Sequence, residues 1–231
     1  MKAVDYSEIW QIVHLSIGVS LVAMVFTIPL AIGVAYLLAT RRFPGWHVLN
    51  ALCHLPLVMP PVITGYLLLL SFGPKGAIGS FLQSVFGISF AFNWLGAALA
   101  AGIMAFPLVM RPIRLAFENQ DREILESAKT LGAKPLIAFL QISLPLAMPG
   151  ILAGGVLGFA KALGEFGATI TFVSNIPGET RTLALAVYSF LQSPDSDNAV
   201  IALVLIGIAI SFAAILLSEV VSSKITGRQK R

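Results

Sequence analysis

The sequence is poor in the residues from which disulfide frameworks, metal centres and enzyme active sites are built. Its single cysteine, Cys53, lies in an apolar stretch, which excludes a disulfide framework and a cysteine-based zinc site. The histidines His14, His47 and His54 are scattered, without the spacing of a ligand set. There is no Gly-x-x-x-x-Gly-Lys-Ser/Thr phosphate loop, no dinucleotide fingerprint and no catalytic triad. We therefore expect no enzymatic activity, no ATP site, no bound metal and no other cofactor in this chain.

Charged residues are also scarce. They make up 11% of the chain, less than half of the roughly 25% found in soluble domains, while 57% of the residues are hydrophobic. This balance predicts a membrane protein in contact with lipid. The formal net charge of +4 does not indicate a nucleic-acid partner, because the basic residues lie between and beyond the hydrophobic stretches and form no single patch.

The hydrophobic residues form about five stretches that could cross a bilayer, each needing ~20 apolar residues. The predicted spans are residues 12–39, 49–72, 95–117, 146–172 and 199–221. A shorter apolar stretch, residues 77–92, is predicted to be interfacial and to be broken by Gly79 and Gly87. Another, residues 183–192, is predicted to be interfacial or re-entrant. We expect an all-α, polytopic membrane protein with a single transmembrane domain over residues 1–231 and a core over about 12–221.

The distribution of basic residues predicts the orientation in the membrane. With five spans, one side holds Arg41, Arg42, Arg111, Arg114, Arg122, Lys129, Lys134, Lys224, Arg228, Lys230 and Arg231. The opposite side holds the basic residues Lys2, Lys75 and Arg181 beside the acidic residues Asp5, Glu8, Glu179, Asp195 and Asp197. We therefore expect the amino terminus outside, and the carboxyl terminus and the loop 118–145 in the cytoplasm.

The loop 118–145 is the longest polar segment and is predicted to fold as a helical hairpin. Asn119 or Asp121 can cap a first short helix that ends near Leu131. Gly132 suits the left-handed position that follows a helix, and Pro135 suits the first turn of a second helix. On these residues alone, two interpretations stay open: a solvated amphipathic loop, or a helix presented to a cleft in a soluble partner.

The spacing Glu-x-Ala, three residues, Gly, nine residues, Ile-x-Leu-Pro resembles the EAA loop of binding-protein-dependent ABC importer permeases. The matching residues are Glu126, Ala128, Gly132, Ile142, Leu144 and Pro145, and Ser127 replaces the usual Ala with another small residue. The resemblance implies a type I ABC importer permease fold with short interfacial and coupling helices. It also implies that these seven residues couple the chain to a separate ABC ATPase subunit.

Proline residues interrupt the second predicted span. Pro56, Pro60 and Pro61 leave backbone groups that lipid cannot satisfy, so this segment must be buried or line a watered cavity. Both a packed kink and a pathway-lining break near Thr64 and Gly65 remain open. Pro60, Pro61 and Thr64 are therefore candidate pathway residues.

The fourth predicted span carries both small residues and charges. Gly150, Gly154 and Gly158 form a stripe for close helix packing, either within the subunit or against a second copy. Lys161 and Glu165 lie four residues apart on one helix face and can neutralise each other. They are predicted to form a structural ion pair or to face the transport pathway, where they could meet an ion.

Residues 164–169 and 172–182 resemble the corresponding stretches of molybdate permeases, and this resemblance extends from about Ser16 to Glu219. It implies a multi-pass permease of the cell inner membrane, a homodimer, that works with an ABC ATPase and a periplasmic or extracellular molybdate-binding protein by alternating access. Tungstate and sulfate permeases are close relatives and remain alternatives. A secondary transporter would instead require inverted repeats and a self-sufficient ion site, and a membrane anchor would have a dispensable loop.

Overall fold

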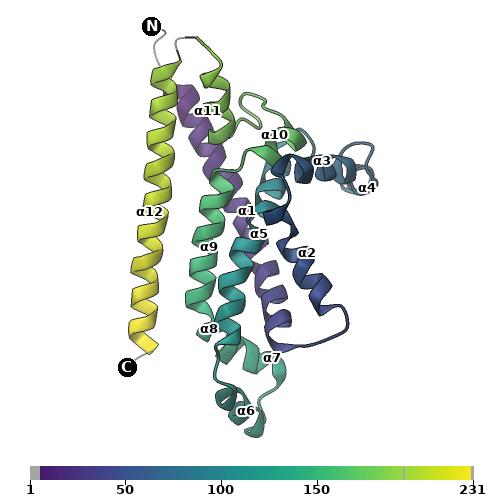
Figure 1. Cartoon of the computed structure of the whole chain (residues 1–231), viewed down its shortest axis with the longest axis vertical. Helices are drawn as coiled ribbons and strands as arrows, with labels where there is room; N and C mark the ends of the chain where they lie inside the picture. The colour runs from purple at the N-terminus through teal and green to yellow at the C-terminus, as the bar shows by residue number, and fades with distance from the viewer. Residues whose placement is uncertain (1–5, 195, 230–231) are drawn as a thin grey trace.

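The computed structural model describes residues 6–194 and 196–229, and every regular element in this part of the chain is helical (Figure 1). The longer helices are α1 (Tyr6–Thr40), α2 (Trp46–Val58), α3 (Pro61–Phe72), α4 (Ala77–Phe86), α5 (Trp94–Glu118), α9 (Met148–Leu163) and α12 (Asp197–Gln229). The shorter elements are α6 (Arg122–Thr130), α7 (Pro135–Ala138), the π-helix η1 (Phe139–Ser143), α8 (Leu144–Leu146), α10 (Gly167–Val173) and α11 (Leu183–Leu191). The all-α prediction is confirmed.

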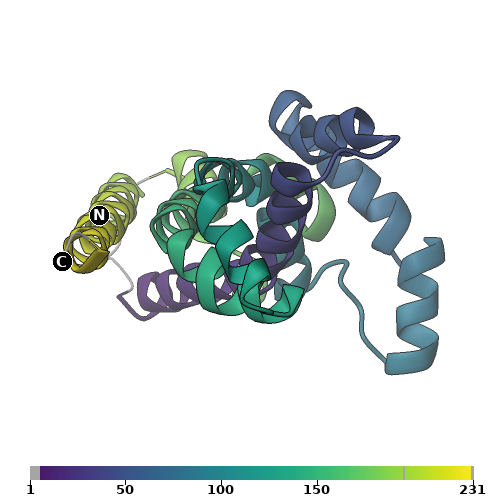
Figure 2. The ribbon, with the colours of Figure 1, turned by 90° about the horizontal axis from the view of Figure 1, so that it is seen from below.

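Helix α5 is the centre of the bundle. Helices α1 and α9 both pack along it, and Figure 2 shows the three together in the body of the molecule. Many of the buried residues of α5 are small, among them Ala97, Ala101 and Ala105, so neighbouring helices can approach closely. A second apolar cluster joins the start of α1 to α11 and α12 through residues such as Ile12, Ala186 and Leu203.

The glycine stripe of α9 lies against α5 within the same subunit. A Cβ added to Gly154 would lie 2.5 Å from the carbonyl oxygen of Val109, and one added to Gly158 would lie 2.3 Å from the Val109 side chain. At Gly150 the added atom would meet Ala116 and the backbone of Pro112 at 2.6 Å. The interpretation that this stripe packs within the subunit is therefore confirmed.

The predicted spans agree with the helices in part. Helices α1, α5 and α12 are long and apolar enough to cross a membrane, in agreement with the first, third and fifth predicted spans. The second predicted span is divided into α2 and α3, which are bent by 114° where Pro60 precedes the first turn of α3. The count of five spans holds when each bent helix pair is taken as one span.

The fourth predicted span, residues 146–172, is wrong as one continuous helix. Helix α9 ends at Leu163, and α10 begins separately at Gly167. Hydrophobicity alone could not show this break, because apolar residues flank it on both sides. The membrane-crossing length comes instead from the segment Pro135–Leu146 followed by α9, with a bend of 65° between them.

The two short apolar stretches form short helices. Gly87 ends α4 with a left-handed backbone (φ +67°), as expected for a helix terminus. The predicted break at Gly79 is wrong, because Gly79 lies inside α4, where its missing side chain lets the carbonyl oxygen of Gly73 approach. Helix α11 is too short to span. Lys2, Asp5, Asp195, Lys230 and Arg231, which entered the orientation prediction, lie outside the described residues.

The close contact between α9 and α5 predicts a stability difference between adjacent glycines. Gly154→Ala should lower the thermal unfolding midpoint of the detergent-solubilised protein, with a cost of about 1–3 kcal/mol, because the backbone oxygen of Val109 cannot yield. Gly155→Ala is the matched control, since its added Cβ would lie 3.3 Å from the flexible end of Ile28. Equal midpoints for the two variants would contradict this packing.

Candidate functional site

The segment between α5 and α9 forms the predicted helical hairpin at one end of the molecule, called here the hairpin end (Figure 1). The backbone nitrogen of Glu123 donates a hydrogen bond to Asp121 Oδ1 at 2.9 Å, so Asp121 caps α6. Asn119 is instead the C-cap of α5. Gly132 is left-handed (φ +84°) after α6, and Pro135 occupies the first turn of α7, both as predicted.

The residues of the EAA-like motif are not equally accessible. Glu126, Ser127 and Gly132 are exposed on and after α6, whereas Ala128 is buried. In the second half of the motif, Ile142 and Leu144 are half-buried and Pro145 is exposed. The motif thus combines an accessible surface in α6 with a packed segment in η1 and α8.

Large apolar side chains are exposed on the same hairpin. Leu131 is 88% exposed and Leu136 is 67% exposed, and Ile124, Ile137 and Leu140 are also accessible. Ile124 and Leu131 lie in a segment that carries acidic and basic residues and precedes the fourth span, whereas Leu136, Ile137 and Leu140 lie in Pro135–Leu146, the first part of that span. Exposed apolar side chains gathered among polar ones are typical of a protein-binding surface.

The base of the hairpin is closed by a contact that the sequence did not indicate. Gln120 Nε2 donates a hydrogen bond to the carbonyl oxygen of Ser143 at 2.7 Å. This bond joins the beginning and the end of the hairpin where the chain leaves and re-enters the bundle. The same oxygen accepts from the backbone nitrogen of Ala147 at 3.0 Å. Because Gln120 and Ser143 are far apart in the chain, no local pattern could have predicted their contact.

Within the bundle, Lys161 and Glu165 form the predicted ion pair, with 2.5 Å between Nζ and Oε2. The side chain of Glu165 is 2% exposed and that of Lys161 is 30% exposed. The other carboxylate oxygen of Glu165 accepts from the backbone nitrogen of Ala168 at 3.1 Å. Glu165 therefore neutralises Lys161 and satisfies the start of α10 at the same time.

The break in the second span lies beside this ion pair. A Cβ added to Gly167, at the start of α10, would lie 2.7 Å from Pro61, and one added to Gly65 would lie 2.5 Å from the carbonyl oxygen of Ala168. The hydroxyl of Thr64 is buried and has no hydrogen-bond partner among the described residues. Pro61 and Glu165 thus both contact α10, and Lys161 pairs with Glu165. Thr64 adjoins Gly65, which packs on Ala168, and Pro60 is the exposed N-cap of α3.

A separate cavity of about 530 Å³ lies between α1, α2 and α5. Its lining is almost wholly apolar and includes Phe26, Leu52, Leu99 and Phe106. The predicted pathway residues do not line it. An apolar cavity of this kind suits a lipid chain or packed side chains better than it suits a charged solute.

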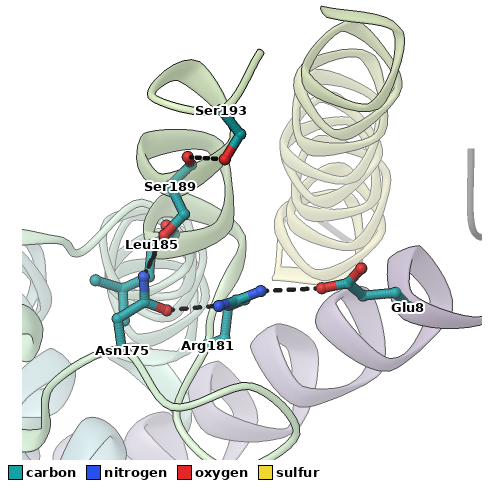
Figure 3. A network of polar contacts seen from close by, with 6 residues as sticks. All are labelled: Glu8, Asn175, Arg181, Leu185, Ser189 and Ser193. Atoms are coloured by element: carbon teal, nitrogen blue, oxygen red, sulfur yellow. Dashed lines mark hydrogen bonds and ion pairs between the residues drawn. The ribbon is translucent and has the colours of Figure 1, made fainter. Parts of the chain in front are cut away.

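At the opposite end of the bundle, a polar network joins the start of α1 to the loop before α11 (Figure 3). Arg181 Nη1 pairs with Glu8 Oε1 at 2.9 Å, and Arg181 Nε donates to Asn175 Oδ1 at 3.2 Å. Asn175 in turn contacts Ser189 of α11. From the sequence, Glu8 and Arg181 could be placed only as charges on one side of the membrane, because their pairing depends on the tertiary fold.

The family model for binding-protein-dependent transport system inner membrane components matches residues 27–227. A protein of Haemophilus influenzae described as molybdenum transport system permease protein ModB is 51% identical over 212 residues, which cover 92% of this chain and 93% of that protein. The protein of the same description in Escherichia coli K12 is 52% identical over 210 residues, with 91% and 92% covered.

Among solved structures, a chain of a bacterial ABC transporter involved in the import of the acidic polysaccharide alginate has a TM-score of 0.76 with this one. The match covers 96% of this chain and 81% of that chain at 17% sequence identity. At this identity the likeness concerns the fold, which is that of an ABC importer permease.

The two roles of Glu165 can be separated by substitution. Glu165→Gln keeps an acceptor for the nitrogen of Ala168 but leaves Lys161 without a charge partner, whereas Glu165→Ala removes both contacts. We expect both variants to lower the thermal unfolding midpoint, and the alanine variant to cost about 1–3 kcal/mol more. Adding Lys161→Met to Glu165→Gln should restore part of the lost stability, because the unpaired ammonium group is then removed. An unfolding midpoint no higher than that of Glu165→Gln alone would show that loss of the charge pair is not what destabilises that variant.

Proposed function

The chain belongs to the family of binding-protein-dependent transport system inner membrane components, and we propose that it is the molybdate-translocating permease subunit of an ATP-driven importer. The observation that carries this proposal is the identity of 51% and 52% to two molybdenum transport permeases over more than nine-tenths of the chain. The chain is a multi-pass membrane protein. ATP hydrolysis is assigned to a separate ATPase chain.

The hairpin is the proposed contact with the ATPase. Its exposed residues Glu126, Ser127 and Gly132 and the apolar side chain of Leu131 present a surface that precedes the fourth span. Ala128, Ile142, Leu144 and Pro145 are proposed to maintain the shape of this surface and its connection to α9. A short helix with one accessible face suits insertion into a groove of a soluble partner.

This assignment orients the chain in the membrane. The hairpin and the carboxyl terminus face the cytoplasm, and the amino terminus faces outside, as the distribution of Lys and Arg also favours. The opposite end of the bundle, with the Glu8–Arg181 network, then faces the binding protein that delivers the oxyanion. ATP binding moves the hairpins, the spans open outward, and the oxyanion enters a transient cavity between them.

The oxyanion pathway is assigned to the region around the start of α10, with Pro60, Pro61, Thr64, Lys161 and Glu165 as its candidate residues. Broken helices leave backbone groups that can face a solute inside a membrane, and Lys161 keeps a partly exposed ammonium group beside its partner Glu165. The exposure of Lys161 on α9 also supports a homodimer, because charged side chains within membrane segments face a bundle interior or a water-filled cavity and not lipid. A second copy of the chain, on the other side of a water-filled pathway, would cover the face of α9 that carries Lys161.

Gly132 offers a direct test of coupling. Gly132→Val should abolish uptake at normal protein levels, because a β-branched residue does not adopt the left-handed backbone found there. Gly132→Asn should retain much of the uptake, since Asn tolerates this conformation. Gly33→Val in α1 is the control, because an added Cβ there meets nothing within 4 Å. Normal uptake by Gly132→Val would favour a membrane anchor with a dispensable hairpin.

The substrate and the energy source can be tested together in proteoliposomes. The chain is reconstituted with a candidate ATPase subunit and a molybdate-binding protein, and uptake of labelled molybdate is measured. We expect uptake to require both partners and ATP, and equimolar sulfate to leave it unchanged. Uptake without the ATPase would instead indicate a secondary transporter, and competition by sulfate or tungstate would indicate a broader or different oxyanion specificity.

A further inference from the structure

Three aromatic rings from distant parts of the chain meet where the hairpin joins the bundle. They are Tyr36 in the last turns of α1, Phe117 at the end of α5 and Phe139, the first residue of η1. The ring centroids of Tyr36 and Phe139 are 4.7 Å apart, and those of Tyr36 and Phe117 are 5.3 Å apart. Both pairs have the edge-to-face geometry that aromatic rings prefer.

This cluster gives the hairpin a contact with a helix to which it is not covalently adjacent. The hairpin continues directly from α5 and leads through α8 into α9, so these two helices follow its movement through the backbone. Helix α1 ends far earlier in the sequence, at Thr40. The edge-to-face contact of Phe139 with Tyr36 therefore connects the hairpin to α1 through side chains.

The end of α1 also contacts the start of α2, the first helix of the broken second span. Trp46, the first residue of α2, donates a hydrogen bond from Nε1 to the carbonyl oxygen of Leu38 at 3.0 Å and is 8% exposed. The guanidinium of Arg42 lies 4.1 Å from the centre of the same indole ring. Helix α2 then leads to the bend before Pro61, so a displacement of the end of α1 reaches the break in the second span.

We propose that Tyr36 and Phe139 are positioning residues that transmit the movement of the hairpin through α1 and Trp46 to the α2–α3 break. This inference rests on the proposed function, since it requires the hairpin to be driven by an ATPase. It adds a second route of transmission beside the covalent one through α8 and α9. The rings touch neither ATP nor the oxyanion, and their contribution is to keep the hairpin and the broken span moving together.

The test is the coupling ratio, measured as molybdate taken up per ATP hydrolysed in the reconstituted complex of chain, ATPase and molybdate-binding protein. Phe139→Leu and Tyr36→Leu should still bind the ATPase and hydrolyse ATP, while the ratio falls by about 2- to 10-fold, as expected for the loss of one aromatic contact. Tyr36→Phe should behave like the wild type, because the ring remains. The fall in the double leucine variant should be smaller than the product of the two single falls, because both single variants remove the contact between Tyr36 and Phe139.

Phe90→Leu is the matched control, since Phe90 forms a similar edge-to-face pair with Phe72, 5.8 Å apart, away from the hairpin. Its coupling ratio should equal that of the wild type. Unchanged ratios in both single leucine variants would overturn the inference while leaving the proposed function intact. Loss of assembled complex in both variants would also overturn it, because the rings would then be needed only for folding. A wild-type complex that transports no oxyanion would instead refute the proposed function.

Discussion

Lipid offers no hydrogen-bond partners, so every interruption of a membrane helix must be satisfied by the protein itself. The bundle contains two such interruptions close together, one between α2 and α3 and one between α9 and α10. At the first, Pro60 and Pro61 lack backbone N–H groups, and the carbonyl oxygen of Pro60 accepts from Ile63 at 2.9 Å. At the second, Glu165 accepts from the nitrogen of Ala168 and neutralises Lys161. The two breaks support each other through the contact of Pro61 with Gly167.

The first half of the hairpin, α6 and the turn at Gly132, lies outside the candidate spans, so contact with lipid does not govern its folding. Its folding depends on local signals, namely the Asp121 cap, the left-handed Gly132 and Pro135 in a first helical turn. Its attachment depends on tertiary contacts, namely the Gln120–Ser143 hydrogen bond and the ring contacts of Phe139. A locally folded element that is held by a few tertiary contacts can move as a unit, as the proposed coupling role requires.

Sequence patterns predicted local features well and helix continuity less well. The hairpin cap, the glycine turn and the Lys161–Glu165 pair could be predicted, because each depends on residues within a few positions of one another. The continuous helix over residues 146–172 was wrong, because Gly164 and Glu165 end α9 within an otherwise apolar stretch. The break at Gly79 was also wrong, because close packing on Gly73 makes glycine suitable inside α4.

The sequence by itself determined the membrane character of the chain, its all-α class, the approximate positions of most spans and the turns of the hairpin. Hydrophobicity, helix capping and backbone conformation act over short distances, so these features are encoded locally. Only the tertiary structure decided that the glycine stripe packs on α5, that the proline break lies beside the ion pair, and which rings join the hairpin to α1. Those contacts join residues that are far apart in the chain, and the packing of the whole bundle brings them together.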